Sequence, residues 1–464
     1  MGVNNFFSCV PQRSKVLFDD SATFMSAEDG ETVGAWNKRY TVAQKKALAD
    51  VDHLVVDAEG IIFKFPGNDL ELAFKKSLAE VAERMVRIKL LPLAQATSKR
   101  LTILFDDGKR TPKLKELEQS QRDKTTRKKR PGRTVSPTLV QRSLVPEQSL
   151  GHHVVMSDQS EPVSAAALYQ FFVHHRNCRR GMKELVIDAL LAQAPEWASD
   201  FGIDIVVRTN RKDSPVTVIG KPKAKDDFVR PFMLGEAEAA AFQVVTQARG
   251  IFKHQAIVTM SSDTDVIAFA MQMREWEADS RLTVCVHTRA NACILDVNRL
   301  QKKTSHTRRV ATGVCFSLLG TDYVRRDKLE ILSHKRNQTL LGLVDKFQDA
   351  VVIDERNRVG VDMDAVTSEL CKSLLTNRGP AIPVRSHWTE RIGFQVRYWS
   401  SSDWTAAEDL AWAESGTSAA PKDSVLKVLV HPDHIGEPVA KRVKRAALEA
   451  AEAEPVEAEA ELDD

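Results

Sequence analysis

Seven acidic residues stand at positions from which their carboxylates can bind a hard metal ion. Asp57 and Asp106 each follow a short apolar run, two more aspartates follow a third run, and two glutamates open a helical pattern. Taken singly, each acid has a structural explanation, because Asp commonly caps a helix and Glu complements the dipole of a first turn. As a set they indicate a metal site. The set is Asp57, Asp106, Glu236, Glu238, Asp263, Asp265 and Asp322.

The spacing within two pairs of these acids favours shared ligation. Asp263 and Asp265 lie two residues apart after the apolar run 256–260, so they face the same side if the strand continues. Glu236 is expected in the entering turn of a helix and Glu238 in its first turn, where negative charge is favourable. Mg²⁺ and Mn²⁺ prefer oxygen ligands, and seven acids suit two ions better than one. Two ions about 3.5 to 4 Å apart would activate water and stabilise the leaving oxygen of a phosphodiester.

Short apolar runs alternate with helical patterns along much of the chain. The runs predict strands at 53–56, 101–105, 203–207 and 256–260, and the patterns predict helices at 70–90, 164–172, 182–194 and 237–248. This alternation predicts an α/β fold in which a mostly parallel sheet carries helices on both faces. In such a fold, residues at the carboxyl ends of strands gather in one crevice, and the acids are expected to meet there.

Several short blocks that contain the acids resemble, in the same order, the signature blocks of the flap endonuclease and XPG-type 5′ nuclease superfamily. The blocks are Met1-Gly2-Val3, Val55-Val56-Asp57-Ala58, Leu104-Phe105-Asp106-Asp107-Gly108-Lys109 with Pro112-Lys113-Leu114-Lys115, Gly235-Glu236-Ala237-Glu238-Ala239, Ser262-Asp263-Thr264-Asp265 and Leu318-Leu319-Gly320-Thr321-Asp322-Tyr323. All seven acids match the metal ligands of that family, and the resemblance spans residues 1 to about 325.

The resemblance implies a fold and an activity. The fold would be PIN-like, a mostly parallel twisted sheet flanked by helices, with a helical arch insertion and a helical C-terminal region. The activity would be structure-selective hydrolysis of DNA at 5′ flaps or at junctions between single strand and duplex. Two Mg²⁺ ions, or Mn²⁺ in their place, would be held by the seven acids.

Basic residues between the second and third acids are candidates for contact with nucleic acid. By resemblance, Lys115 and Arg122 contact the scissile phosphate; they lie seven residues apart and align on a helix, although a solvated basic face is the alternative. The block from Lys124 to Arg133 would bind the phosphate backbone without reading sequence. The nucleic-acid-binding candidates are Gly2, Lys109, Lys113, Lys128, Lys129 and Arg130.

Three departures from the flap endonuclease pattern keep other functions open. The segment after Asp322 lacks the Gly-rich helix-turn-helix signature, the segment 18–41 leaves room for an insertion, and the region between the second and third acids is long. The short segments 3–7 and 59–63 resemble 5′-to-3′ exoribonucleases more than flap endonucleases, so RNA is an alternative substrate. A nucleic-acid-binding scaffold without catalysis is a third reading, although such proteins usually lose cluster acids. A transferase or aspartyl phosphatase would explain only some of the acids.

These features divide the chain into five regions: an N-terminal nuclease region (1–106), an arch with insertions (107–235), an internal nuclease region (236–330), a C-terminal helical region (331–416) and a disordered charged tail (417–464). Two polar, proline-containing stretches, 107–163 and 209–233, are expected to project from the core. The tail is rich in Ala, Glu, Lys and Pro, as disordered segments are.

The composition limits the class of protein. Of 464 residues, 43% are hydrophobic and 28% are charged, which is typical of a globular protein. No apolar run approaches the length of about 18 residues that a membrane helix needs, and the N-terminus lacks a signal-peptide pattern. We therefore expect an intracellular protein without a membrane partner. The segment Lys441–Arg445 is a candidate nuclear targeting signal.

Overall fold

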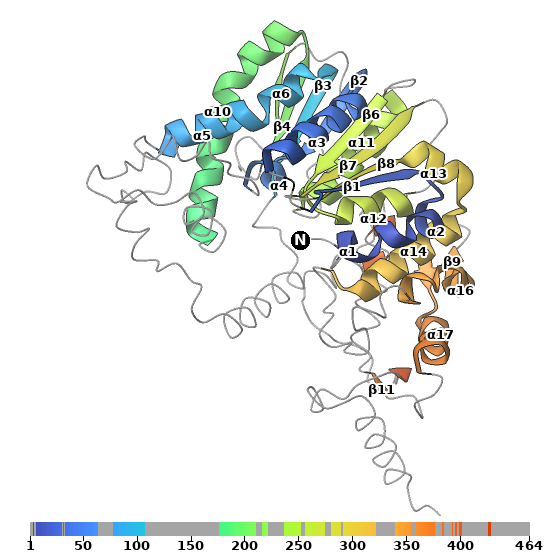
Figure 1. The fold of residues 1–464 in the computed structure, drawn as a ribbon. Helices are drawn as coiled ribbons and strands as arrows, with labels where there is room; N and C mark the ends of the chain where they lie inside the picture. The colour runs from blue at the N-terminus through green and yellow to red at the C-terminus, as the bar shows by residue number, and fades with distance from the viewer. Residues whose placement is uncertain are drawn as a thin grey trace, which may run out of the picture.

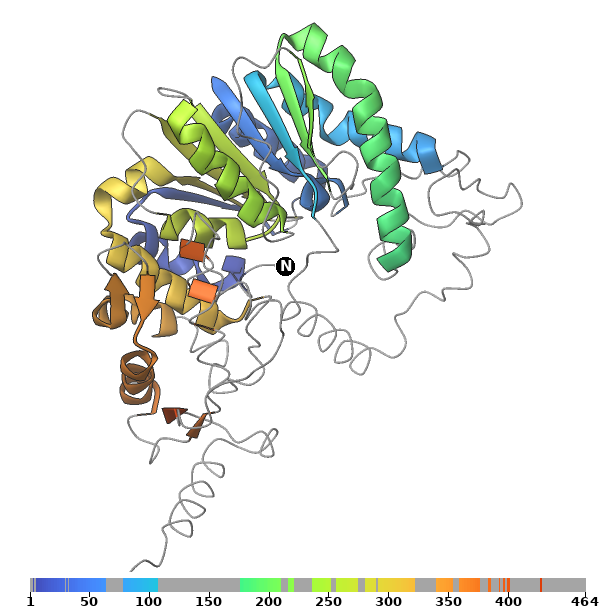
Figure 2. The same ribbon diagram turned by 180° about the vertical axis from the view of Figure 1, so that it is seen from behind.

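The computed structural model describes residues 3, 6–29, 31, 33–63, 78–106, 176–209, 216–220, 236–251, 256–273, 280–288, 291–321, 339–353, 359–375, 383–384, 392, 395–396, 399–400 and 426–427. These residues form one large sheet with helices on both faces (Figures 1 and 2). The predicted α/β class with a mostly parallel sheet is thereby confirmed.

The central strands of the sheet are parallel, and its edges are antiparallel. The strand order is β1-β8-β7-β6-β2-β3-β4-β5. The parallel strands are β7 (Arg281–His287), β6 (Ala256–Ser261), β2 (Val51–Asp57), β3 (Thr97–Leu104) and β4 (Asp204–Arg208). The antiparallel pairings join β8 (Asn291–Asp296) to β7, β1 (Ala22–Ser26) to β8, and β5 (Val216–Ile219) to β4. Because parallel strands share a direction, the carboxyl ends of β6, β2 and β3 lie at one edge.

Both faces of the sheet are buried, as the apolar composition of its central strands predicts. Side chains alternate between the faces, so that Leu54 and Val56 join one core while Val55 joins the other. The first core includes α4 (Ala58–Phe63), α5 (Leu78–Lys89), α6 (Leu91–Gln95) and α10 (Arg176–Phe201). The second includes α1 (Phe6–Cys9), α2 (Ser14–Phe18), α11 (Ala237–Ile251), α12 (Asp265–Gln272), α13 (Val297–Lys303) and α14 (His306–Leu319).

The predicted helices are found where the structure describes the chain. The pattern at 237–248 lies within α11, and the pattern at 182–194 lies within the longer α10, which continues through Pro195. Of the predicted helix 70–90, the described part forms α5. The predicted helix 164–172 lies outside the described residues.

Two segments expected as insertions instead supply edge strands of the sheet. Within 209–233, residues Val216–Ile219 form β5, because a run rich in β-branched residues suits a half-buried edge. Within 18–41, residues Ala22–Ser26 form β1, which extends the opposite edge. The polar surroundings of both runs concealed them in the sequence.

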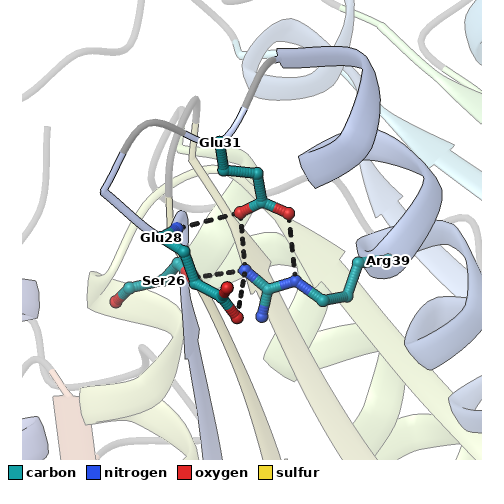
Figure 3. Close-up of polar contacts among 4 residues, drawn as sticks. All are labelled: Ser26, Glu28, Glu31 and Arg39. Carbon is teal, nitrogen blue, oxygen red and sulfur yellow. Dashed lines mark hydrogen bonds and ion pairs between the residues drawn. The ribbon is translucent and has the colours of Figure 1, made fainter.

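An arginine on α3 (Val33–Ala47) fixes that helix beside strand β1 (Figure 3). Arg39 Nη2 donates to the carbonyl of Ser26 at 2.7 Å and to Glu31 Oε2 at 2.7 Å. Its guanidinium also lies 5.0 Å from the ring centroid of Trp36. Arg39 therefore joins the end of the edge strand to the helix that follows it.

The described C-terminal part is helical with two small sheets, whereas a helical region alone was expected. It contains α16 (Val344–Phe347), α17 (Met363–Leu375) and the paired strands β9 (Val351–Ile353) and β10 (Val359–Val361). Strand β11 (Pro383–Val384) pairs with β12 (Leu426–Lys427), so two residues of the tail expected to be disordered form a strand. The remainder of the tail, including Lys441–Arg445, lies outside the described residues.

In the described part of the chain, no helix is both long and apolar enough to cross a membrane.

Candidate functional site

Six of the seven predicted acids are described, and all six lie at the carboxyl edge of the parallel strands. Strand β2 ends at Asp57, Asp106 follows β3, and Asp263 follows β6, while β2 lies between the other two strands. Glu236 and Glu238 stand at the start of α11, which packs over these strands. We call Asp57, Asp106, Glu236, Glu238, Asp263 and Asp265 the acid edge. The seventh acid, Asp322, lies outside the described residues.

A serine joins the acids of two neighbouring strands. Ser261, the last residue of β6, donates from its hydroxyl to Asp57 Oδ2 at 2.7 Å. The same hydroxyl accepts a hydrogen bond from the backbone N–H of Asp263 at 2.9 Å. Asp57 and the turn that carries Asp263 are therefore held through one buried oxygen atom. Sequence reasoning missed Ser261, although its position at the end of an apolar strand was visible.

The carboxylate of Asp57 is also confined by the helix that follows it. The N–H of Gly60 donates to Asp57 Oδ1 at 3.2 Å. A Cβ atom at Gly60 would overlap the Ser262 hydroxyl and would lie 2.6 Å from Asp57 Oδ2. Glycine at position 60 therefore allows α4 to approach the acid edge closely.

The start of α11 holds the acid of the third strand. Asp106 Oδ1 accepts a hydrogen bond from the N–H of Ala237, the first residue of α11, at 2.7 Å. A carboxylate at this position satisfies an N–H group that has no partner within the helix and complements the helix dipole. Glu236 precedes the helix and Glu238 lies in its first turn, as predicted. Asp106 is thus brought next to both glutamates.

The expectation that Asp263 and Asp265 face the same side of one strand is wrong. Strand β6 ends at Ser261, and Asp265 is the first residue of α12. The N–H of Asp265 donates to Asp263 Oδ1 at 3.4 Å, so the turn itself brings the two residues together. The hydroxyl of Ser261, the last residue of β6, accepts the N–H of Asp263, so the turn begins directly at the end of the strand.

A buried lysine that sequence reasoning missed contacts the same edge. Lys183 of α10 donates from Nζ to Glu59 Oε1 at 2.5 Å and also to the backbone carbonyl of Asp106. Glu59 lies in the first turn of α4, two residues after Asp57. The pair joins residues 124 positions apart, and nothing in either local pattern indicates the partner.

A buried arginine, Arg208, stands at the end of β4, the strand next to β3. Asp57 is aligned with Leu104 and Leu104 with Arg208, so the side chain of Arg208 leaves the sheet on the same face as that of Asp57. Arg208 is only 1% exposed, and its burial lowers the pKa of the guanidinium to about 10. It is still a cation at neutral pH.

The acid edge is buried to an extent that requires compensation of its charge. Asp57, Glu236, Glu238, Asp263 and Asp265 are each between 5% and 8% exposed, and Asp106 is half-buried. Buried carboxylates are costly unless they are hydrogen-bonded and paired with cations or metal ions. The donor set, carboxylate oxygen throughout, is the one that Mg²⁺ and Mn²⁺ prefer.

The ligand geometry of a metal centre is not formed by the described side chains alone. Among them, no group of three or more His, Cys, Asp or Glu is arranged to hold an ion. The chemistry of the donors and their position at one edge of the sheet fit a divalent ion, but the described side chains do not bring three ligands close enough to bind one.

The predicted basic residues lie outside the described part of the chain. This holds for both catalytic candidates, Lys115 and Arg122, and their roles stay predictions. It holds equally for the nucleic-acid-binding candidates Gly2, Lys109, Lys113, Lys128, Lys129 and Arg130.

No model of a known protein family matches this chain, and no curated protein matches it closely enough to indicate a relative.

Proposed function

We propose that this protein is a metal-dependent, structure-selective 5′ nuclease with a PIN-like fold, similar to flap endonucleases, that hydrolyses DNA phosphodiesters. The observation that carries the proposal is the meeting of Asp57, Asp106 and the Asp263 turn at three adjacent strand ends. Buried carboxylates on neighbouring parallel strands, with two glutamates at an adjoining helix start, are a set of ligands for hard cations.

In this proposal the acid edge and Asp322 hold two Mg²⁺ ions. When bound, the ions supply the charge that activates water and stabilises the leaving oxygen, so that no protein nucleophile is needed. The chain itself fixes the ligands. Ser261 orients Asp57, and the N–H of Ala237 orients Asp106, so both carboxylates are held before the substrate binds.

The substrate would be held by the basic region between Asp106 and Glu236. Lys115 and Arg122 are proposed to contact the scissile phosphate, where negative charge develops during the reaction. The block that contains Lys128, Lys129 and Arg130 would bind the backbone of single-stranded or duplex DNA without base specificity.

A 5′-to-3′ exoribonuclease is the second candidate, and the same site would serve it. Described residues of both segments that resemble exoribonucleases contact the acid edge or the turn that carries Asp263. The Thr264 hydroxyl donates to the carbonyl of Val3 at 3.4 Å, and Gly60 donates to Asp57. The two candidates differ in substrate and not in chemistry.

One gel assay separates the candidates. Purified protein with Mg²⁺ is incubated with 5′-labelled flap DNA, single-stranded DNA and single-stranded RNA, and Asp57→Asn is the matched control against a contaminating nuclease. Metal-dependent cutting at the flap junction supports the first candidate, and stepwise loss of RNA supports the second. Binding of all three substrates without cleavage would identify a scaffold and overturn the assignment as an enzyme.

A further inference from the structure

Lys183 connects two of the elements that carry acids. Its ammonium group contacts the side chain of Glu59 in the first turn of α4 and the backbone carbonyl of Asp106 after β3. Asp57 immediately precedes α4, so the lysine links the segments that follow β2 and β3. The lysine itself lies on α10, a helix that packs against α5 on the opposite face of the sheet from α11 (Figure 1).

The ion pair is buried on both sides. The Lys183 and Glu59 side chains are 7% and 9% exposed. A buried pair of this kind gives little net stability over an apolar pair of similar size, because both charges lose their hydration. Stability alone therefore does not account for a lysine at this position.

The contact with the Asp106 carbonyl gives the lysine a second effect. Asp106 is held at two points, since its carbonyl accepts from Lys183 and its carboxylate accepts from the N–H of Ala237. Two points of attachment on opposite sides fix both the backbone and the direction of the carboxylate. Groups that orient metal ligands in this way act strongly on metal affinity without touching the ion.

We propose that Lys183 is a positioning residue that fixes Asp106 relative to Asp57, and that it thereby sets the affinity of the acid edge for divalent cations. The inference rests on the proposed function, because it requires that the acid edge bind a metal. It goes beyond that function by assigning a role to a residue that is not an acid and does not touch the ion.

The test measures metal binding directly. Mn²⁺ is titrated into the full-length protein in a calorimeter, and the Mn²⁺-induced shift in Tm is recorded in parallel. The main variant is Lys183→Met with Glu59→Gln, which removes both charges, retains the side-chain volume and leaves no uncompensated carboxylate. We expect Mn²⁺ affinity to fall about 10- to 100-fold, as is typical for loss of an orienting group. Lys183→Arg, which keeps a donor, is expected to recover part of the affinity.

A second ion pair on the same sheet, which is buried on the arginine side and partly buried on the aspartate side, is the control. Arg100 and Asp204 are 4% and 20% exposed, lie 3.4 Å apart and stand near the amino ends of β3 and β4. Arg100→Met with Asp204→Asn is expected to change Tm and to leave Mn²⁺ affinity unaltered. Unaltered affinity in the Lys183 double variant would overturn the positioning role while leaving the proposed function intact. Absence of Mn²⁺ binding in the unmodified protein would overturn both.

Discussion

The hydroxyl of Ser261 lies 2.7 Å from Asp57 Oδ2 and thereby joins the ends of two parallel strands, β6 and β2. The same oxygen also accepts the N–H of Asp263. One side chain therefore determines the relative positions of two proposed ligands, Asp57 and Asp263, although Ser261 and Asp57 are 204 positions apart in the sequence.

Ser261→Ala removes both of these hydrogen bonds. We expect the free energy of unfolding to fall by about 2 kcal/mol, because a bond to a charged group is lost in a buried site. We also expect the Mg²⁺ concentration needed for half-maximal cleavage to rise about tenfold. Thr97→Val is the control, since it removes a buried hydroxyl at the opposite end of β3 that donates to Leu93. An equal change in the Mg²⁺ requirement of both variants would contradict this role for Ser261.

Gly60→Ala tests the close approach of α4 to the acid edge. Alanine usually stabilises a helix by about 1 kcal/mol over glycine, but here the added Cβ would overlap the surroundings of Asp57. We expect cleavage to fall about 100-fold, as for a ligand displaced by about 1 Å. Gly360→Ala is the control, because its Cβ would meet only ordinary contacts, the nearest at 3.7 Å from the Val352 carbonyl. A Gly60→Ala variant with unaltered cleavage and raised stability would show that the site tolerates the methyl group.

His53 gives the fold a specific sensitivity to acid. The residue is fully buried beside Thr102, and burial, assisted by Arg100, lowers its pKa from 6.5 to about 3. The unfolded chain therefore takes up the proton first as the pH falls. The contribution to stability is complete above pH 6.5 and is lost progressively down to about pH 3. The slope is about 1.4 kcal/mol per pH unit.

His53→Gln keeps a hydrogen-bonding group beside Thr102 and removes the titration. Between pH 7 and pH 5, we expect urea unfolding to show a loss of stability in the variant that is smaller by about 2 kcal/mol. An equal loss of unfolding free energy in the variant and the unmodified protein would show that His53 is not the group responsible.

Substitutions of the proposed metal ligands and substitutions of the basic residues are expected to have different effects on cleavage and on nucleic-acid binding. Asp263→Ala should abolish cleavage and leave nucleic-acid binding nearly intact. Lys115→Ala and Arg122→Ala should lower the single-turnover rate more than the affinity, because their charge acts mainly in the transition state. Neutralising the block 128–130 should weaken binding and flatten its salt dependence. Indistinguishable behaviour of the basic variants over a salt series would identify one uniformly solvated basic face.

The positions of the six described acids at the strand ends and at the start of α11 could be predicted because they depend on local signals. Apolar runs that end near Asp57, Asp106 and Asp263 predict parallel strands, and parallel strands place their ends at a common edge. The helix start at Glu236 and Glu238 was equally local, because the apolar pattern begins directly after it. These features require no knowledge of which strands are neighbours.

The contacts that orient the acids could not be predicted because they join distant segments. Lys183 meets Glu59 only once α10 has packed against the sheet, and Ser261 meets Asp57 only because β6 and β2 are neighbours. Strand β5 was missed for a related reason, since its short run gains its partner from the tertiary pairing with β4.

The most direct test of the metal-dependent nuclease site is the single-turnover cleavage of 5′-labelled flap DNA as a function of Mg²⁺ concentration, with the unmodified protein and Asp57→Asn measured side by side. We expect a cleavage rate that rises with Mg²⁺ to saturation and falls to background in EDTA, and a rate at least about 100-fold lower in the variant, because an essential ligand is lost. Cleavage that persists in EDTA, or that is equal in the two proteins, would contradict the assignment of the acid edge as the catalytic site.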